Sequence, residues 1–197
     1  MDRTDPPNAP CGCAPAARVG VHRRQVIGIA AVGVAAPLTL AALPVAAAAV
    51  GDGLVEEDAE GAPAPLRVGD LKPGKPMVAF PFDAKRNAAR DETRLNKIVL
   101  IRLTEAEMTA ETRARAAGGV LAYSAICTHQ ACDVKTWLAK EKVLVCFCHS
   151  SKFTPLDGAK VTAGPATRAL PAIPLSLVGD RLVIAGPFTA SPGATPG

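Results

Sequence analysis

The residues with the clearest capacity for chemistry lie in two short boxes, Cys127-Thr-His-Gln-Ala-Cys132 and Cys146-Phe-Cys-His-Ser-Ser151. Together the boxes hold four of the six cysteines and two of the three histidines in the 197-residue chain. Thiolate and imidazole groups are common ligands of transition metals in proteins. One Cys and one His from each box would surround a metal centre, and each box would keep one further cysteine.

Zinc is one candidate for this centre, because two cysteines and two histidines make a common tetrahedral zinc site. Zinc fingers usually supply these ligands as a Cys-Cys pair and a His-His pair, whereas each box here mixes the two types. Zinc would also leave Cys132 and Cys148 without a role. An exported zinc-binding structural module therefore stays open as an alternative of a different functional class.

The two boxes resemble those of the Rieske iron–sulfur proteins, which read C-T-H-x-G-C and C-P-C-H-G-S. The resemblance covers about residues 120–168. It implies a [2Fe-2S] cluster held by two cysteines and two histidines: Cys127 and Cys146 on one iron, His129 and His149 on the other.

The resemblance also implies a disulfide between Cys132 and Cys148, which an exported protein can form. Mixed ligation has a physical consequence, because a cluster with four thiolates would carry two more negative charges and accept an electron less readily. Rieske centres therefore span roughly −150 to +300 mV, against about −400 mV for plant-type ferredoxins. The outer imidazole nitrogens can couple electron uptake to proton uptake.

Three residues depart from the family wording, since Ala131, Phe147 and Ser150 stand where Gly, Pro and Gly are usual. Ala131 and Ser150 therefore require backbone angles that a residue with a Cβ atom can adopt. Phe147 either adds apolar surface near the cluster or packs inward, and the sequence leaves both options open.

Four further residues are expected beside the cluster from the same resemblance. Ser151 keeps the position whose hydroxyl donates to a cluster sulfide in the family. Phe153 stands where high-potential members carry a Tyr that donates to a ligand thiolate, so the sequence predicts a lower potential than theirs. Gly164-Pro165 resembles the loop that covers the cluster, although a surface turn would also fit these residues.

The first fifty residues predict export. Arg23-Arg24, followed by Gln25, precede residues 26–50, which contain no charged residue and are long enough to cross a bilayer core of about 30 Å. Paired arginines before a mildly apolar run, after an n-region at 1–25, resemble a twin-arginine signal, which carries folded proteins. An ordinary signal peptide or membrane helix is the alternative. We expect a periplasmic or outer-face location, with cleavage near Ala46–Ala49 and an uncleaved anchor both open.

The remaining chain predicts an all-β fold. We expect a Rieske-type antiparallel β domain over 67–190, with a smaller cluster-binding part at about 120–168, and one apolar N-terminal helix before it. Residues 51–66 contain five acids and no base, which predicts a flexible acidic linker. Residues 191–197 are expected to form a disordered tail.

Apolar, β-branched runs predict individual strands within that domain; they lie at 97–103, 120–126, 142–146, 173–178 and 181–184. Gly179-Asp180 predicts a hairpin turn between the last two. Thr104 and Glu107 resemble a capping box that opens a helix running to about Ala117. Tyr123 and Trp137 are expected to serve packing.

The Rieske resemblance implies an electron-transfer subunit that is not catalytic alone, so no catalytic residue is assigned. Rieske dioxygenases lack the disulfide and carry a large mononuclear-iron domain, for which the chain has no room. Phe153 and the absence of Gly after His149 favour the small subunit of arsenite oxidase. That subunit passes electrons from a molybdopterin subunit to an acceptor, for which we expect a cytochrome c or a cupredoxin.

The alternative electron-transfer setting is the Rieske subunit of a bc-type quinol–cytochrome c reductase, with cytochrome b as partner. The net charge of +4 is spread along the chain, and no basic stripe with interleaved aromatic residues predicts nucleic-acid binding. Membrane contact is expected only through an uncleaved N-terminal segment. No role is assigned to Cys11 and Cys13.

Overall fold

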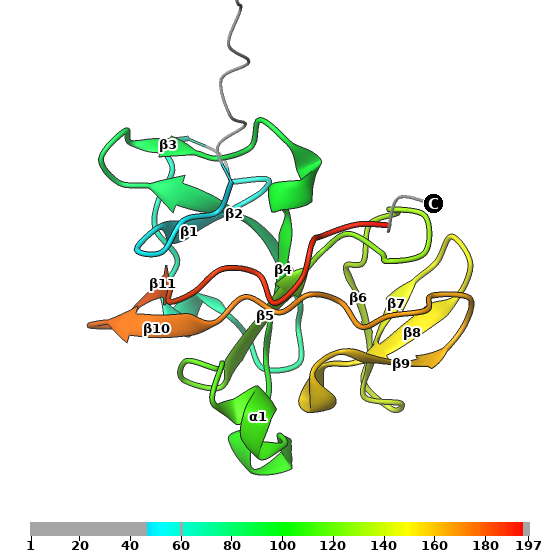
Figure 1. The fold of residues 1–197 in the computed structure, drawn as a ribbon. Helices are drawn as coiled ribbons and strands as arrows, with labels where there is room; N and C mark the ends of the chain where they lie inside the picture. Colours follow the sequence, from blue (N-terminus) through cyan, green and yellow to red (C-terminus); the bar gives the residue numbers. More distant parts are fainter. Residues whose placement is uncertain (1–46, 60, 195–197) are drawn as a thin grey trace, which may run out of the picture. The chain divides into compact units, whose positions relative to one another are not determined.

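The computed structural model describes residues 47–59 and 61–194 of the chain (Figure 1). The described residues form β-strands joined by loops, one short α-helix and four single-turn 3₁₀ helices. The strands are β1 Gly53–Glu56, β2 Met77–Asp83, β3 Ala88–Ala89, β4 Ile98–Arg102, β5 Val120–Ser124, β6 Thr136–Leu138, β7 Val143–Cys146, β8 Ser151–Thr154, β9 Lys160–Ala163, β10 Leu175–Val178 and β11 Arg181–Ile184. The helix is α1 Ala110–Arg113, and the 3₁₀ turns are Val68–Asp70, Arg94–Asn96, Glu105–Glu107 and Pro155–Asp157.

Two antiparallel sheets make up the fold. The larger sheet has the strand order β10-β11-β1-β2-β4-β5, with β3 paired to β2. The smaller sheet has the order β6-β7-β8-β9 and lies beside the β4–β5 edge in Figure 1. The prediction of an all-β fold with a smaller second part is confirmed for the described residues.

The core extends across both sheets, which fixes the smaller sheet against the larger one. One group of buried side chains combines Val99 and Tyr123 from the larger sheet with Leu144 and Phe153 from the smaller one. The Tyr123 hydroxyl donates a 2.7 Å hydrogen bond to the carbonyl of Pro155, and burial raises its pKa. Tyr123 therefore packs in the core, as expected, and a polar contact satisfies its only polar atom.

The strands predicted from apolar, β-branched runs are all present as β4, β5, β7, β10 and β11. The predicted hairpin is also confirmed, because Val178 pairs with Arg181 around a turn in which Gly179 has a φ of +65°. A backbone angle of this sign is open to glycine without steric cost, which explains the residue at this position.

The prediction of a flexible acidic linker over 51–66 is wrong for its first part. β1 lies between β11 and β2 inside the larger sheet, and Leu54 and Val55 are buried in it. The acidic composition of this segment suggested a solvated linker, but two of its acids, Asp52 and Glu57, pair with bases elsewhere in the chain. Glu57, directly after β1, forms an ion pair with Lys97.

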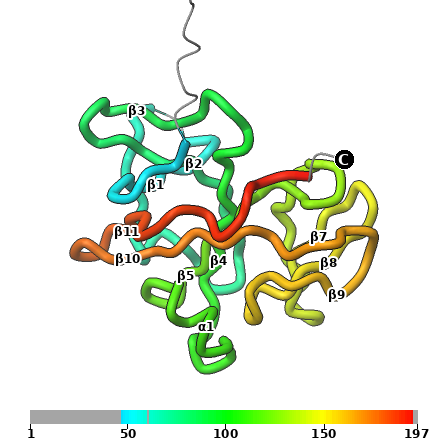
Figure 2. Tube along the Cα trace, in the orientation of Figure 1, coloured from blue at the N-terminus to red at the C-terminus, as the bar shows by residue number. Residues whose placement is uncertain are grey.

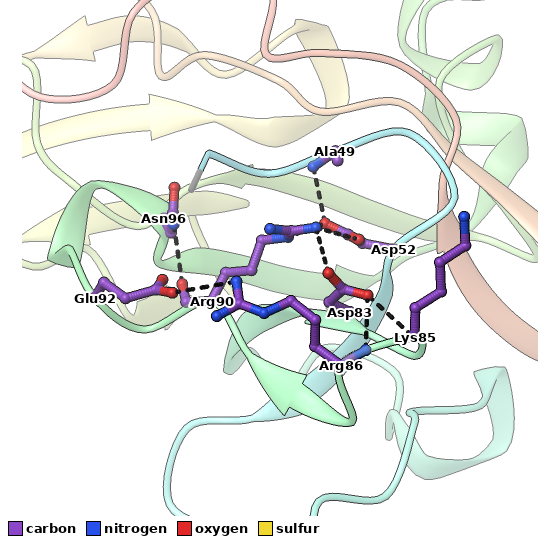
Figure 3. Close-up of polar contacts among 8 residues, drawn as sticks. All are labelled: Ala49, Asp52, Asp83, Lys85, Arg86, Arg90, Glu92 and Asn96. Carbon is purple, nitrogen blue, oxygen red and sulfur yellow. Dashed lines mark hydrogen bonds and ion pairs between the residues drawn. The ribbon is translucent and has the colours of Figure 1, made fainter. Parts of the chain in front are cut away.

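Asp52 is buried and belongs to an ion cluster that holds the start of β1 in place (Figure 3). Its carboxylate accepts a 2.7 Å hydrogen bond from Arg90 and a 2.8 Å bond from the backbone N–H of Ala49. Arg90 also donates to Asp83 at 2.9 Å, and the Arg90 carbonyl accepts from the Asn96 side chain. The hydrogen bond with Asp52 raises the pKa of the Arg90 guanidinium above its ordinary value.

The predicted helix from Thr104 to about Ala117 is also wrong in length. The Thr104 side chain makes no capping hydrogen bond, and the turn after it ends at Met108, whose backbone is extended. Thr109 caps the actual helix α1 by accepting from the N–H of Thr112. The buried Met108 side chain accounts for the break, since packing overrides the helical pattern at that position.

The prediction of a disordered tail is wrong at its start. The carbonyl oxygens of Ser191 and Gly193 both accept hydrogen bonds from Arg168. Figure 2 shows the segment after β11 running along the strand-like segment before β10, and Thr189 and Ala172 exchange hydrogen bonds there. The C-terminal segment is therefore part of the folded domain as far as the structure describes it.

The predicted n-region and most of the predicted apolar helix lie in residues 1–46, outside the described residues. Within the described residues, none of the helices has the length and apolar character that a membrane span requires.

Candidate metal centre

A disulfide between Cys132 and Cys148 links the two boxes, as the resemblance implied. The first box follows β5 and the second lies between β7 and β8. The sulfur atoms of Cys132, Cys148 and Cys146 all lie within 4.8 Å of one another. Because Cys132 and Cys148 bind each other, Cys146 is the one of these three whose sulfur stays available to a metal.

Cys127 and Cys146 are free cysteines with buried side chains. The Cys127 backbone forms a tight loop, in which its N–H donates to the Cys132 carbonyl at 2.7 Å and its carbonyl accepts from the N–H of Ala131. Burial raises the pKa of the Cys146 thiol, as does the neighbouring Cys127 thiol, while the N–H groups of Cys148 and His149 lower it. A metal replaces the protons of such thiols and stabilises both as thiolates.

The rings of the two histidines, His129 and His149, lie against each other. Their ring centroids are 4.7 Å apart and the rings are nearly perpendicular. The Nδ1 atom of His129 is the one buried side-chain nitrogen or oxygen without a hydrogen-bond partner among the described residues. A buried polar atom without a partner is costly, and a metal bond would satisfy it. The residues present therefore fit a cluster with two thiolate and two imidazole ligands.

Gly164 and Ala166, in the loop after β9, contact the second box at Ser151. A Cβ atom on Gly164 would lie 2.4 Å from the Cα of Ser151, and its φ of +86° also favours glycine. The buried Ser151 hydroxyl accepts a 3.1 Å hydrogen bond from the N–H of Ala166. The hydroxyl hydrogen of Ser151 stays available to another acceptor. Gly164 therefore packs directly on the box, whereas Pro165 next to it is exposed.

Ala131 and Ser150 both have a φ of +57°, in the left-handed region. As expected, residues with a Cβ atom adopt these backbone angles, although the angles cost conformational free energy. Residues other than glycine lose roughly 1–2 kcal/mol in this region. The boxes therefore keep the backbone shape that glycine would adopt more easily.

The two phenylalanines of this region have opposite environments. Phe147 is 69% exposed, so it adds apolar surface and does not pack inward, which the sequence had left open. Phe153 is completely buried and pairs with Leu144 in β7. Phe153 lies in the same cluster of buried side chains as Cys127 and Cys146, and its ring carries no hydroxyl that could donate a hydrogen bond there.

An ion cluster that the sequence reasoning missed attaches the first box to the larger sheet. Asp133, directly after Cys132, pairs with Arg94 and with Lys97. Burial raises the pKa of Asp133, but the hydrogen bonds from Arg94 and Lys97 outweigh it and keep the pKa below its ordinary value. The hydrogen bond with Glu57 raises the pKa of Lys97. A lysine directly before an apolar strand was the sequence signal for this cluster.

Thr128 was also missed. Its buried hydroxyl donates a 2.7 Å hydrogen bond to the carbonyl of Arg168, the residue whose guanidinium binds the C-terminal segment. The first box is thus fastened at one end by Thr128 and at the other by Asp133.

The family model of the Rieske [2Fe-2S] domain matches residues 66–174. The putative respiratory nitrate reductase subunit Rieske of Haloferax mediterranei is 43% identical over 76 residues, covering 38% of this chain and 34% of that protein. The cytochrome bc1 complex Rieske iron-sulfur subunit of Corynebacterium glutamicum is 37% identical over 95 residues, covering 46% and 23%. The chain thus matches about a quarter to a third of the length of these relatives.

Among solved structures, the plasma membrane Rieske protein of Synechocystis is 22% identical, with a TM-score of 0.42 over 61% of this chain and 95% of that chain. The family match covers more than half of the 197 residues, and the cofactor of that family is the [2Fe-2S] cluster. The chain belongs to the Rieske [2Fe-2S] domain family.

Proposed function

We propose that the protein is the Rieske subunit of an exported oxidoreductase complex. In this proposal it passes electrons from an arsenite oxidase-like molybdopterin subunit to a cytochrome or cupredoxin acceptor. The proposed ligands are Cys127 and Cys146 on one iron and His129 and His149 on the other. When bound, the [2Fe-2S] cluster supplies a one-electron carrier of relatively high potential.

Two observations carry the electron-transfer proposal: the buried Nδ1 atom of His129 has no hydrogen-bond partner, and Cys127 and Cys146 are buried free thiols. The chain's own residues do three things for such a centre. The core excludes water from Cys127 and Cys146, and the disulfide fixes the two boxes together. His149 is exposed, so its outer nitrogen can exchange a proton with a partner at the surface.

The choice of a molybdopterin partner is supported by Phe153, which has no hydroxyl to donate to a ligand thiolate. It is also supported by the short connection to the apolar run. Only Gly51 and Asp52 separate the end of that run at Val50 from β1 at Gly53. A head that shuttles between a quinol site and a haem needs a long mobile linker. Residues 51–66, for which a linker was predicted, contain strand β1 instead.

A bc-type complex is the second candidate, because several relatives with 28–37% identity are named as cytochrome bc1 complex Rieske subunits. Isolation of the complex around a tagged full chain from its native membranes would separate the two settings. We expect molybdenum to copurify with the two irons, without b-type haem. A b-type haem spectrum without molybdenum would contradict the molybdopterin proposal.

Export by the twin-arginine route is a further part of the proposal, and Arg23-Arg24 support it. Replacement of both with Lys keeps the charge but removes the signal. We expect the R23K/R24K chain to accumulate in the cytoplasm with its cluster, while the wild-type chain reaches the outer face. Unchanged export of the variant would point to an ordinary signal peptide or anchor instead.

A further inference from the structure

The alanine run at residues 46–49, near which cleavage was left open, enters the described part of the chain at Ala47. Signal peptidases cut after a short pattern whose first and third residues are small. The run offers this pattern at two bonds, after Ala48 and after Ala49, and Val45 offers a looser match after Ala47. The sequence does not choose among the three bonds, but the surroundings of each new N-terminus differ in the structure.

Ala49 is held by a tight turn that joins it to Asp52 at the start of the folded domain. Its N–H donates to the Asp52 carboxylate at 2.8 Å, and its carbonyl accepts from the N–H of Asp52 at 3.1 Å (Figure 3). Gly51, inside this turn, donates its N–H to a carbonyl at the end of β11 at 2.9 Å. These bonds would keep Ala49 in place after a cut directly before it, because none of them involves an earlier residue.

The bond between Ala48 and Ala49 lies at the surface. Ala47 before it is exposed, and Val50 after it is 67% exposed. Neither Ala47 nor Ala48 makes a hydrogen bond to another residue that the structure describes. These two residues can therefore leave the domain and enter a peptidase without breaking a hydrogen bond of the described fold.

The buried part of the ion cluster around Asp52 carries one more negative than positive charge. Asp52 and Asp83 bring two carboxylates, with side chains 7% and 15% exposed, whereas Arg90, at 14%, brings one guanidinium. The other charged residues around the cluster are exposed on the surface: Lys85, Arg86 and Glu92. A positive charge on the nitrogen of Ala49 would balance the buried group at 2.8 Å from Asp52.

Resting on the proposed export, we propose that the chain is cleaved between Ala48 and Ala49, and that the new α-ammonium group of Ala49 forms an ion pair with Asp52. Cleavage one residue earlier would put the ammonium group on Ala48. That residue packs against the apolar core of the larger sheet and lines an apolar groove with Leu95 and Phe188, where a charge is costly. Cleavage one residue later would remove the nitrogen that donates to Asp52.

This ion pair would make the stability of the processed chain depend on pH. An α-amino group ordinarily has a pKa of about 7.7–8.0, and a neighbouring carboxylate raises the pKa in the folded state. Arg90 repels the ammonium group, but the carboxylates of Asp52 and Asp83 outweigh this one cation. The stabilisation is therefore complete below the ordinary pKa and is lost as pH rises through the folded pKa.

The first test uses the full chain, expressed with a C-terminal tag in a bacterium that has the twin-arginine route. Protein collected from the outer face is examined by N-terminal sequencing and intact mass, and we expect it to begin at Ala49. Ala48→Leu places a large residue directly before the cut and should reduce processing at least about tenfold. Ala47→Leu is the matched control, because the middle position of the pattern is unrestricted, and its product is identical to that of the wild type.

The second test measures the ion pair in the processed chain. NMR titration of ¹³C-alanine-labelled protein should give the Ala49 α-amine a pKa about one unit above its ordinary value, a tenfold gain in proton affinity. Asp52→Asn should abolish most of this shift. Asp70→Asn is the control, since the exposed Asp70 carboxylate also accepts a backbone N–H, that of Arg67, and should leave the shift unchanged. If Asp52→Asn does not fold, the titration of the wild-type chain decides alone.

Several results would overturn this proposal. A full-length chain on the outer face, or one that begins at Ala48 or Val50, would rule out the cleavage site. An Ala49 α-amine with an ordinary pKa, or with a raised pKa that Asp52→Asn leaves unchanged, would rule out the ion pair. A full-length wild-type chain that stays in the cytoplasm would contradict the proposed export and this proposal with it. A correctly processed chain without the cluster would contradict the electron-transfer function alone.

Discussion

The ammonium group of Lys97 lies 3.3 Å from the carboxylate of Asp133, and it thereby ties the residue after Cys132 to the start of β4. Lys97 also pairs with Glu57 just after β1. One lysine therefore connects the first box, the larger sheet and the segment that follows β1. Its side chain is 18% exposed, so this pair is shielded from solvent better than most surface ion pairs.

Lys97→Met should lower the free energy of unfolding by about 1–2 kcal/mol, because it leaves Glu57 and Asp133 partly buried with less compensation. The partners hold the pKa of Asp133 below its unfolded value near 3.9, so this stabilisation is present above that pH and is lost as pH falls through the folded pKa. Denaturant unfolding between pH 2 and pH 7 should show the difference between wild type and variant shrinking in acid.

Lys142→Met is the matched control, since the pair of Lys142 with Glu107 is about half exposed on both sides. It should change stability by less than about 1 kcal/mol at any pH. Equal effects of the two variants would show that Lys97 has no special structural role.

Ala131→Gly and Ser150→Gly should each stabilise the protein by about 0.5–1 kcal/mol. Glycine relieves the cost of a φ of +57° and loses part of this gain through its freer unfolded state. Ala163→Gly, in strand β9, should instead destabilise by about 0.5–1 kcal/mol. Thermal unfolding of the three variants checks the signs, and destabilisation by all three would contradict the left-handed geometry.

Arg90→Ala should destabilise by about 3 kcal/mol, because it leaves the Asp52 carboxylate buried without its cation. Arg86→Ala, whose 4.0 Å pair with Glu92 is exposed, should fall within about 0.5 kcal/mol of wild type. Limited proteolysis should then cut the Arg90 variant near β1 faster than wild type. Identical digestion patterns would argue against a role of this ion cluster in holding β1.

Phe153→Tyr should raise the midpoint potential of the cluster. A hydroxyl that stabilises the reduced state by about 1 kcal/mol more than the oxidised state corresponds to roughly 40 mV for one electron. Phe147→Tyr places its hydroxyl on an exposed ring and should leave the potential unchanged. If a redox titration gives Phe153→Tyr the same midpoint potential as wild type, the missing hydroxyl at position 153 does not lower the potential.

Cys127→Ser and His149→Ala should each abolish the cluster, since each removes a proposed ligand. Cys132→Ser should leave a cluster that assembles but is lost more readily, because only the link between the boxes is missing. Iron and acid-labile sulfide analysis of the three purified variants distinguishes the cases. Equal loss in all three would show that the disulfide is needed for assembly.

The parts of the fold that the sequence predicted are those that depend on local pattern. β4, β5 and β7 are mostly apolar, and Gly179 marks its turn directly. β1 was missed because its neighbours are acids whose partners, Arg90 and Lys97, lie some forty residues later. Consequently a fragment that starts at residue 67 lacks a central strand.

The site divides in the same way. The resemblance carried by the two boxes implied Cys127 and His129 as ligands and the disulfide between Cys132 and Cys148. Asp133 and Thr128 look ordinary in sequence, and their role depends on side chains that only the tertiary fold brings near. The direction of Phe147 was likewise undecidable, since an aromatic residue between two cysteines can pack inward or face solvent.

An EPR-monitored redox titration of the full chain, purified under conditions that keep it folded, tests whether the protein holds a Rieske cluster. We expect a Rieske-type signal that appears on reduction, two irons per chain, and a midpoint potential in the middle of the family's range of roughly −150 to +300 mV. A colourless protein with one zinc ion per chain and no such signal would contradict this expectation.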